Sequence, residues 1–115
     1  MAIARRLAVV TLGIGVLLGS APAFAITSTT TGSKAYTSKS GAGVTDGRAN
    51  VEDTSADSRA AYGQYERKSA PGEVRTLWNK SGAGTTVYSD GAQVYKIRAC
   101  RQEQWGPDSC GNWAA

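Results

Sequence analysis

Hydrophobic and polar residues alternate in short stretches along the chain from about residue 44 onwards. Alternation with a period of two is typical of strands that are buried on one side only. Glycine, proline and serine residues separate the stretches at the close spacing of an antiparallel β domain. We therefore predict an all-β fold, a small antiparallel sandwich of about six or seven short strands. The expected strands are 48–53, 59–67, 73–79, 85–88 and 93–102, the second of which is also compatible with a short helix.

The stretch 93–102 gives the clearest strand. Tyr95, Ile97 and Ala99 share the side that would face the core, and the two basic residues between them face solvent. By the same parity Cys100 falls on the solvent side, unless a β-bulge resets the register.

Two further expectations concern the segment 73–91. Val74, Thr76 and Trp78 share one side of their strand, which suits a strand that carries an aromatic ring into the core. The sequence Ser-Asp-Gly at 89–91 is typical of a hairpin turn, in which the glycine takes a positive φ.

Residues 1–25 have the three parts of an export signal. Arg5 and Arg6 precede a short apolar run, and Ala23 and Ala25 form the small-x-small pattern that signal peptidase cuts. The run is shorter than the roughly 20 residues that a membrane-spanning helix needs. We expect cleavage after Ala25, by general secretion in preference to the twin-arginine route. The mature protein would then be secreted and extracellular, with no membrane association.

Charge and composition argue against several functions. Removing the signal leaves eleven of the thirteen basic residues against nine acidic ones, a net charge of +2. The basic residues are scattered singly, whereas nucleic-acid-binding proteins gather them on one face. The chain has no histidine, which excludes Ser-His-Asp and Cys-His catalysis in their ordinary forms. No carboxylate pair stands out for glycoside hydrolysis. We expect a monomer that is not an enzyme, needs no cofactor and binds no nucleic acid.

Covalent crosslinking is expected because hydrophobic material is scarce. Cys100 and Cys110 are the only cysteines, and in an oxidising compartment an even pair predicts a disulfide. Gly106 and Pro107 provide a turn that brings the two together. We expect this bond to tie the C-terminal tail across the outside or the edge of the sheet.

The mature chain is long enough for one domain. Residues 26–43 are mostly serine, threonine, glycine and lysine, and we expect a flexible N-terminal arm with at most one short strand. Residues 44–115 would then form the β domain. Aliphatic residues are few there, so we expect the tryptophan and tyrosine rings to supply a small aromatic core.

Two acidic residues and two tryptophans are candidates for binding. Asp53 and Asp57 lie four residues apart on a turn, where carboxylates either cap backbone amides or hold Ca²⁺. Capping is favoured, because a calcium site needs six to eight oxygen ligands. Trp105 and Trp113 are the rings best placed to be exposed, where they would stack on sugars or anchor a protein partner. The favoured alternative is that Trp113 folds back over the sheet to close the core and that Trp105 fills the disulfide loop.

Several short motifs follow one another along the chain, namely Val51, Asp53-Thr54, Ala56-Asp57, Arg98-Ala99-Cys100 and Cys110-Gly111-Asn112-Trp113. With these motifs the chain resembles a group of small secreted actinobacterial proteins of unassigned function, over about residues 44–113. The resemblance implies a compact β-sandwich and no established activity. Proteins of this group carry an Asp-Thr-x-Ala-Asp-Gly turn, and here Ser58 stands in place of its glycine. Many of them also have an earlier cysteine pair, which this chain lacks.

These observations favour a secreted, non-enzymatic binding or interaction module. Its partner would be a cell-wall polysaccharide or another extracellular molecule, contacted through aromatic side chains. The alternative is a small secreted effector, either an antagonistic peptide or an inhibitor that presents the disulfide loop.

Overall fold

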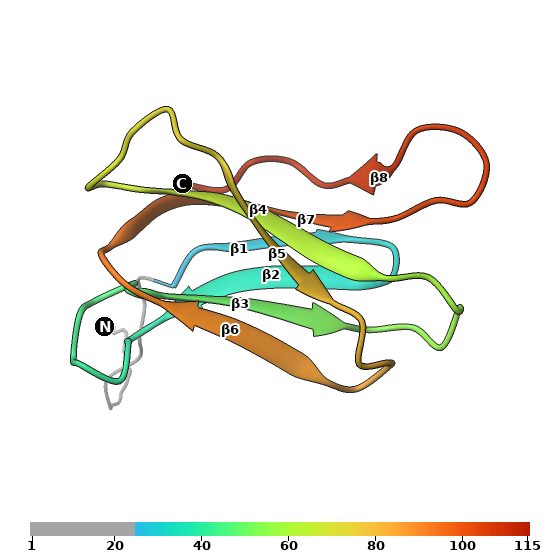
Figure 1. Ribbon diagram of the computed structural model, residues 1–115, viewed down its shortest axis with the longest axis horizontal. Coiled ribbons are helices and arrows are strands. Elements are labelled where there is room, and N and C mark those ends of the chain that lie inside the picture. The colour runs from blue at the N-terminus through green and yellow to red at the C-terminus, as the bar shows by residue number, and fades with distance from the viewer. Residues whose placement is uncertain (1–24) are drawn as a thin grey trace, which may run out of the picture.

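Residues 25–115 are described by a computed structural model, and they form two antiparallel sheets (Figure 1). The described residues contain no helix, which confirms the predicted all-β sandwich. One sheet has the order β1-β2-β3-β6 and the other the order β5-β4-β7-β8. Apart from Ala25, the predicted export signal, including Ala23, lies outside the described residues. The strands are β1 (Thr27–Thr30), β2 (Ser33–Ser38), β3 (Arg48–Asp53), β4 (Ala61–Arg67), β5 (Arg75–Asn79), β6 (Thr86–Asp90), β7 (Val94–Arg101) and β8 (Ser109–Cys110).

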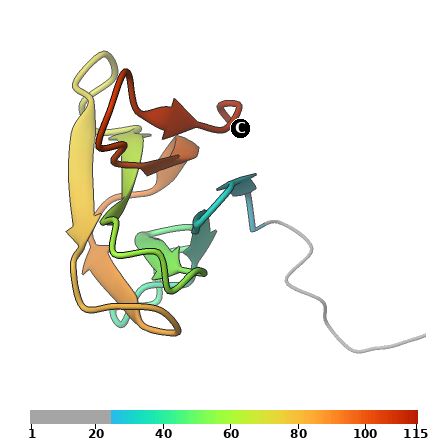
Figure 2. The same cartoon turned by 90° about the vertical axis from the view of Figure 1, so that its right-hand side faces the viewer.

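The chain passes between the sheets three times. After β3 it enters the second sheet for β4 and β5, returns to the first for β6, and goes back to the second for β7. Strands β5 and β6 follow one another along one side of the sandwich (Figure 2). In the strand order of its own sheet, each of the two is an edge strand.

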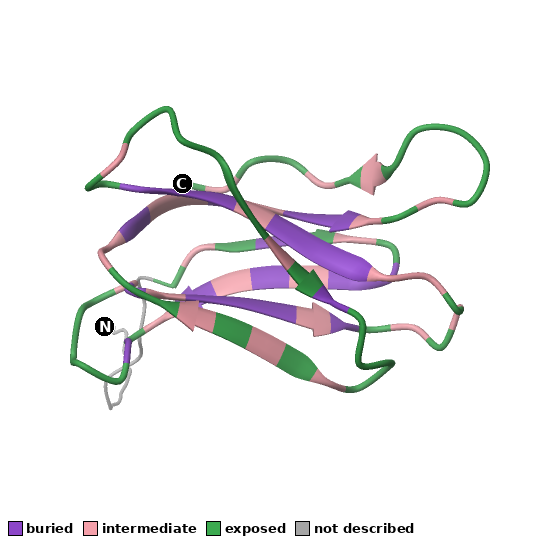
Figure 3. Ribbon diagram, in the orientation of Figure 1, coloured by how far each residue is buried: buried purple, intermediate pink, exposed green. Residues whose placement is uncertain are grey.

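Small side chains fill the space between the sheets. At Gly63 the sheets approach so closely that a Cβ atom would lie 2.7 Å from Cγ2 of Val51 and 3.3 Å from Cβ of Ala35. The purple segments in Figure 3 lie mainly on the central strands β2, β3, β4 and β7. The buried hydrophobic cluster consists of Ala35, Ala49, Val51, Ala61, Tyr65, Val94, Ile97 and Ala99.

The expected aromatic core is wrong for the tryptophan rings, although Tyr62 and Tyr65 are buried. Of the tryptophans, Trp78 is 40 % exposed, Trp105 83 % and Trp113 36 %. An indole would not fit between sheets that approach as closely as these do at Gly63. The large rings therefore lie on the outside of the sandwich, and Tyr65 is the aromatic member of the buried cluster.

The segment expected to be a flexible arm contains β1 and β2. Its small hydroxyl side chains pack between the sheets and have hydrogen-bond partners. The Ser28 hydroxyl accepts a bond from the backbone N–H of Ala99 at 3.0 Å and donates to the carbonyl of Asn112 at 2.7 Å. Polar side chains can be buried when they are paired in this way. Polar composition alone was therefore a poor guide to order in this segment.

The face of β5 is the reverse of the predicted one. Val74, Thr76 and Trp78 are exposed, whereas Leu77 packs against the core and Asn79 is fully buried. The Asn79 amide group donates to the carbonyls of Val51 and Thr85, at 3.0 and 2.8 Å. Its side-chain oxygen accepts a further bond at 2.9 Å from the backbone N–H two residues later. These bonds compensate for its burial and fix which side of the strand faces inward.

The segment after β6 is not a hairpin turn, because β6 and β7 belong to different sheets. Gly91 has no positive φ. A Cβ atom at Gly91 would lie 2.7 Å from Cζ of Arg67, so the glycine makes room for this buried guanidinium. Arg67 donates to the carbonyls of Gly47 at 3.0 Å and Ser89 at 3.1 Å, and also to that of Ala92. It thereby joins β4 to the β2–β3 loop and to the crossing segment.

Strand β7 faces the core with Ile97 and Ala99, as predicted, but Tyr95 is only half-buried. A register shift opposite Glu66 and Arg67 places Val94 in the core instead. Such a bulge inserts one extra residue and changes the side on which the following side chains lie.

The predicted disulfide is present between Cys100 and Cys110, which pair directly across β7 and β8. Cys100 lies on the outer side of its sheet, as its parity predicted, but it is fully buried. The bond holds the tail along β7, where Ala114 and Ile97 exchange two backbone hydrogen bonds of 2.8 and 3.0 Å.

We predict that Gly63→Ala lowers the free energy of unfolding by about 1–3 kcal/mol, because its methyl group overlaps Val51. Val51→Ala opens a cavity and also destabilises the fold. In urea unfolding, the double variant should lose less unfolding free energy than the sum of the two single losses, by about 0.5–3 kcal/mol. Gly63→Ala with the more distant Val94→Ala is the control and should be additive. Additive losses for the Val51 pair as well would contradict the close approach of the sheets.

We also predict that replacing both cysteines by alanine lowers the free energy of unfolding by about 2.5–3 kcal/mol, because the crosslink closes a short loop in the unfolded chain. Alanine avoids placing a hydroxyl at the buried position 100. Urea unfolding of the parent, with and without reductant, provides the comparison. An unchanged unfolding midpoint would mean that the crosslink does not support the fold.

Candidate functional site

Aromatic and cationic side chains gather on the outer side of the β5-β4-β7-β8 sheet. Trp78, Tyr62, Cys100 and Cys110 stand opposite one another on the four successive strands and form one row across the sheet. A second row contains Thr76, Gln64 and Arg98. We call the surface formed by Trp78, Tyr62, Gln64, Arg98, Lys96 and Trp113 the aromatic face.

Trp78 forms one end of the aromatic face. Its ring stacks on Tyr62 with the centroids 4.4 Å apart and the planes tilted by 35°. The Lys80 ammonium lies 5.2 Å from the Trp78 centroid. Tyr62 is buried beneath its neighbours, but much of the Trp78 ring is exposed. The stack therefore presents one indole to solvent in a defined orientation.

The disulfide loop fixes the phenol end of Tyr62. The Tyr62 hydroxyl donates to Oδ2 of Asp108 at 2.7 Å, and the other carboxylate oxygen accepts the backbone N–H of Glu103 at 3.0 Å. Burial, together with this bond to Asp108, raises the pKa of Tyr62 to about 12. The same hydrogen bond, with the one from Glu103, lowers the pKa of Asp108. The hydroxyl of Tyr62 is thus an internal contact and not a free donor for a ligand.

Trp113 forms the other end of the aromatic face. The centroid of its ring lies 4.7 Å from the Lys96 ammonium and 4.9 Å from Cζ of Arg98. Cations at these distances are attracted to the electron-rich face of an indole. The Arg98 guanidinium also donates to Oε1 of Gln64, at 2.9 and 2.6 Å. Trp113 therefore covers the sheet from outside and does not close the core.

Glu66 anchors the bulge beside Trp113. It forms an ion pair of 3.2 Å with Lys96 and accepts the hydroxyl of Tyr95 and the backbone N–H of Gly72. The bond from Tyr95, followed by those from Gly72 and Lys96, lowers the pKa of Glu66, and the pKa of Tyr95 is raised in turn. This network keeps Lys96 beneath the indole.

The two tryptophans singled out from the sequence lie in different surroundings. Trp113 belongs to the aromatic face, whereas Trp105 projects from the disulfide loop and is the most exposed of the large hydrophobic side chains. Trp78 and Tyr62 were missed as site residues. The signal that could have found them is their alignment with Cys100, which requires the strand register and is not visible along a single sequence.

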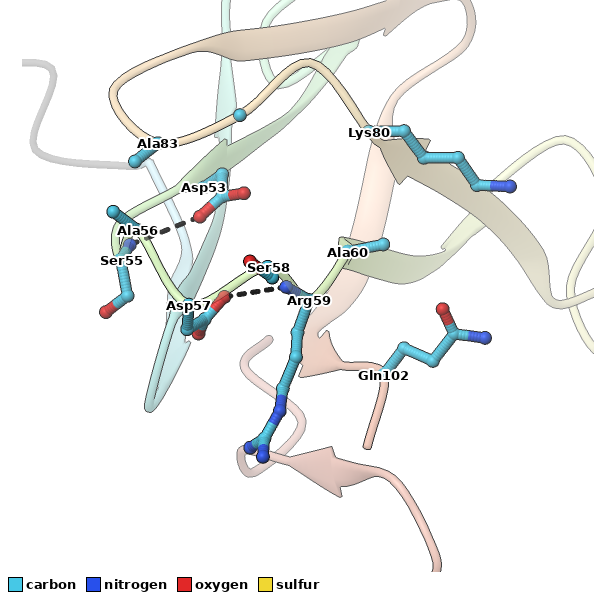
Figure 4. Close-up of a pocket in the computed structure, with 11 residues that line it drawn as sticks. Asp53, Ser55, Ala56, Asp57, Ser58, Arg59, Ala60, Lys80, Ala83 and Gln102 are labelled. Atoms are coloured by element: carbon cyan, nitrogen blue, oxygen red, sulfur yellow. Dashed lines mark hydrogen bonds between the residues drawn. The ribbon is translucent and has the colours of Figure 1, made fainter. Parts of the chain in front are cut away.

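A separate open depression of about 650 Å³ lies beside the turn after β3 (Figure 4). Asp53 accepts the backbone N–H of Ser55 at 3.2 Å, and Asp57 accepts that of Arg59 at 3.0 Å. Both carboxylates therefore cap turn amides, as expected from the sequence. Asp57 also forms an ion pair of 3.3 Å with Arg101. Among residues 25–115 there is no group of three acidic, cysteine or histidine side chains that could hold a metal ion.

Ser58 in this turn has a φ of 58°, the left-handed conformation that glycine adopts most readily. The turn thus keeps a glycine-like geometry with a serine at this position.

Within the described part of the chain there is also no helix long and apolar enough to cross a membrane.

We predict that Asp108→Asn changes stability in a pH-dependent way. The pKa of this carboxyl group is lowered in the folded state, so its ionised form stabilises the fold when the pH is above the unfolded-state pKa of about 4. This stabilisation is lost as the pH falls through the folded-state pKa. The stability difference between parent and variant should therefore shrink when urea unfolding is repeated from pH 7 down to pH 3. Tyr62→Phe, which removes the donor to Asp108, should show the same trend. A difference that is constant with pH would contradict the assigned contact.

The aromatic face is thus a rigid surface with exposed rings at two ends, polar groups between them and carboxylates engaged in internal contacts.

Compared with known proteins, the chain matches no protein-family model, no curated protein and no solved structure.

Proposed function

We propose that this protein is an exported, non-enzymatic binding module that holds an extended polysaccharide, such as a cell-wall polymer, on the aromatic face. The observation that carries the proposal is the pair of exposed indoles, Trp78 and Trp113, held at the two ends of the same outer face of one sheet. Flat aromatic rings stack on the apolar faces of sugars and contribute large contact areas with little loss of side-chain entropy.

The spacing of the two indoles favours a chain of sugars over a single sugar. Trp78 lies on the edge strand β5, and Trp113 lies on the tail beyond β7, with β4 between. Three strand spacings, roughly 14 Å, separate the backbones of the two residues across the sheet. Both rings lean inward from there, Trp78 onto Tyr62 and Trp113 over Lys96 and Arg98. A ligand of several linked sugars would therefore contact both indoles at once, whereas a single sugar would stack on one of them.

Polar groups between the indoles would bind the hydroxyl groups of such a ligand. Thr76, Gln64 and Arg98 form the row that lies between the rings. Among the described residues, Arg98 and Lys80 have no carboxylate within ion-pair distance. Because no carboxylate neutralises these two positive charges, they favour a polymer that carries carboxylate or phosphate substituents.

The carboxylates near the face support a binding role without catalysis. Glu66 and Asp108 are each bound to a tyrosine hydroxyl and to a backbone N–H, and the pKa of each is lowered. A glycosidase needs one carboxyl group with a raised pKa to act as the acid. These two groups are built to stay ionised and to hold side chains in place.

Export and a monomeric state complete the proposal. The disulfide is compatible with an oxidising, extracellular location, where such bonds persist. The resemblance to small secreted actinobacterial proteins and the sequence of residues 1–25 support the same location.

A second candidate function follows from Trp105. This ring is 83 % exposed in a loop that the Cys100–Cys110 bond closes. A constrained loop loses little entropy when it binds, so it suits an inhibitor or an antagonistic peptide that inserts an aromatic ring into a partner. Inhibition of a protease or of neighbouring cells by the pure protein, lost in Trp105→Ala, would favour this function.

We predict that the parent protein binds to insoluble polysaccharides, including peptidoglycan with its attached anionic polymers, and is depleted from solution. Trp78→Ala and Trp113→Ala should each weaken binding about tenfold, because each removes one stacking contact. Trp105→Ala is the matched control, an equally large truncation away from the aromatic face, and should bind as the parent does. Melting temperatures of all variants check that they fold. Failure of the parent to bind any polymer would overturn the proposal.

A further inference from the structure

The N-terminal end of the described chain is fixed by a partly buried relay of two hydrogen bonds. The backbone N–H of Ile26 donates to Oγ1 of Thr37 at 3.0 Å, and the Thr37 hydroxyl donates to Oδ1 of Asp46 at 2.9 Å. We propose that cleavage after Ala25 turns this position into a binding site for the chain's own new α-ammonium group, paired with the carboxylate of Asp46. The inference rests on the export signal that forms part of the proposed function.

Both sides of the relay are held rigidly. Thr37 is fully buried, and its backbone N–H donates to the carbonyl of Ile26 at 3.0 Å. Ile26 is therefore held by its N–H and by its carbonyl, and its side chain packs against the hydrophobic core. The Asp46 carbonyl accepts the backbone N–H of Val94 at 2.8 Å, which fixes the loop that carries the carboxylate.

Cleavage changes the charge at the end of this relay. In the precursor the nitrogen of Ile26 belongs to a neutral peptide bond. After cleavage it is an ammonium group less than about 6 Å from Asp46, because Thr37 Oγ1 lies within hydrogen-bond distance of both. Opposite charges at this separation favour each other's ionised forms. The ion pair therefore exists only in the processed protein.

The surroundings allow such a pair to be solvated and to titrate. The relay borders an open depression of about 430 Å³. Its other titratable lining groups are Lys68, Tyr95 and the α-carboxylate of Ala115, the last residue of the printed sequence, and Tyr95 is bound to Glu66. These groups are the same before and after a change at the terminal nitrogen, so comparing two forms of the terminus isolates the effect of the ammonium group.

The test compares three forms of the chain, each released from a fusion protein by a protease that leaves no extra residues. One begins at Ile26 with a free amine, one begins at Ile26 and is Nα-acetylated, and one retains Ala25. At pH 6.5 the free-amine form should melt roughly 2–4 °C above the other two. The pairing raises the pKa of the ammonium above its unfolded value of about 8, so the advantage should persist below pH 8 and disappear by about pH 10.

Asp46→Asn provides the matched control. Asparagine keeps an oxygen for the Thr37 hydroxyl and tolerates the positive φ of 53° at this position, but it lacks the charge. In this variant the free-amine and acetylated forms should melt at the same temperature. Equal melting of these forms in the parent, or a difference that survives Asp46→Asn, would overturn the ammonium site.

The outcome is independent of polysaccharide binding, because the aromatic face does not include Ile26 or Asp46. It is also separate from the export prediction, which the mass of the naturally secreted chain tests. A mass that starts elsewhere than Ile26 would overturn the cleavage on which the natural role of the site rests, whatever the engineered forms show.

Discussion

The close approach of the two sheets is the constraint on which the rest of the structure depends. At Gly63 a single added methyl group would overlap Val51, so the interior accepts alanine, valine, serine and threonine side chains and excludes indoles. A chain with few aliphatic residues can fill such a narrow space. It gains little hydrophobic free energy in return, because small side chains remove little apolar area from water.

Buried polar groups compensate for the small core. Asn79 joins β5 to β3 and to the loop before β6. Arg67 joins β4 to carbonyl groups in the β2–β3 loop, in β6 and in the segment after β6. Ser28 links β1 to β7 and to the tail. Each group is costly to bury alone but is paired here, so the polar contacts fix the register of the layers as well as their separation.

Sequence patterns predicted the parts of the fold in which side chains alternate regularly. The strand 48–53, the inward positions Ile97 and Ala99, and the disulfide are confirmed. The pattern failed where polar residues are buried, as in the predicted flexible arm, because hydroxyl groups can be satisfied by backbone partners that no single sequence displays. In β5 the satisfied amide of Asn79 outweighed the apparent hydrophobic side of the strand.

The candidate site was predictable only in part, for a related reason. Trp113 could be singled out as an isolated aromatic residue near the end of the chain. Trp78 could not, because its strand was assigned the opposite orientation. Its place beside Tyr62 depends on pairing between strands, which follows from the three-dimensional register.

The narrow core and the aromatic face have a common cause. Indoles excluded from the interior lie on the outside, where the exposed part of each ring offers apolar area for contact with a ligand. The disulfide stands in the same row as Trp78 and Tyr62, and it holds both the loop with Asp108 and the tail with Trp113. One crosslink thus supports the fold and positions both ends of the aromatic face, which makes the geometry of that face dependent on an oxidising environment.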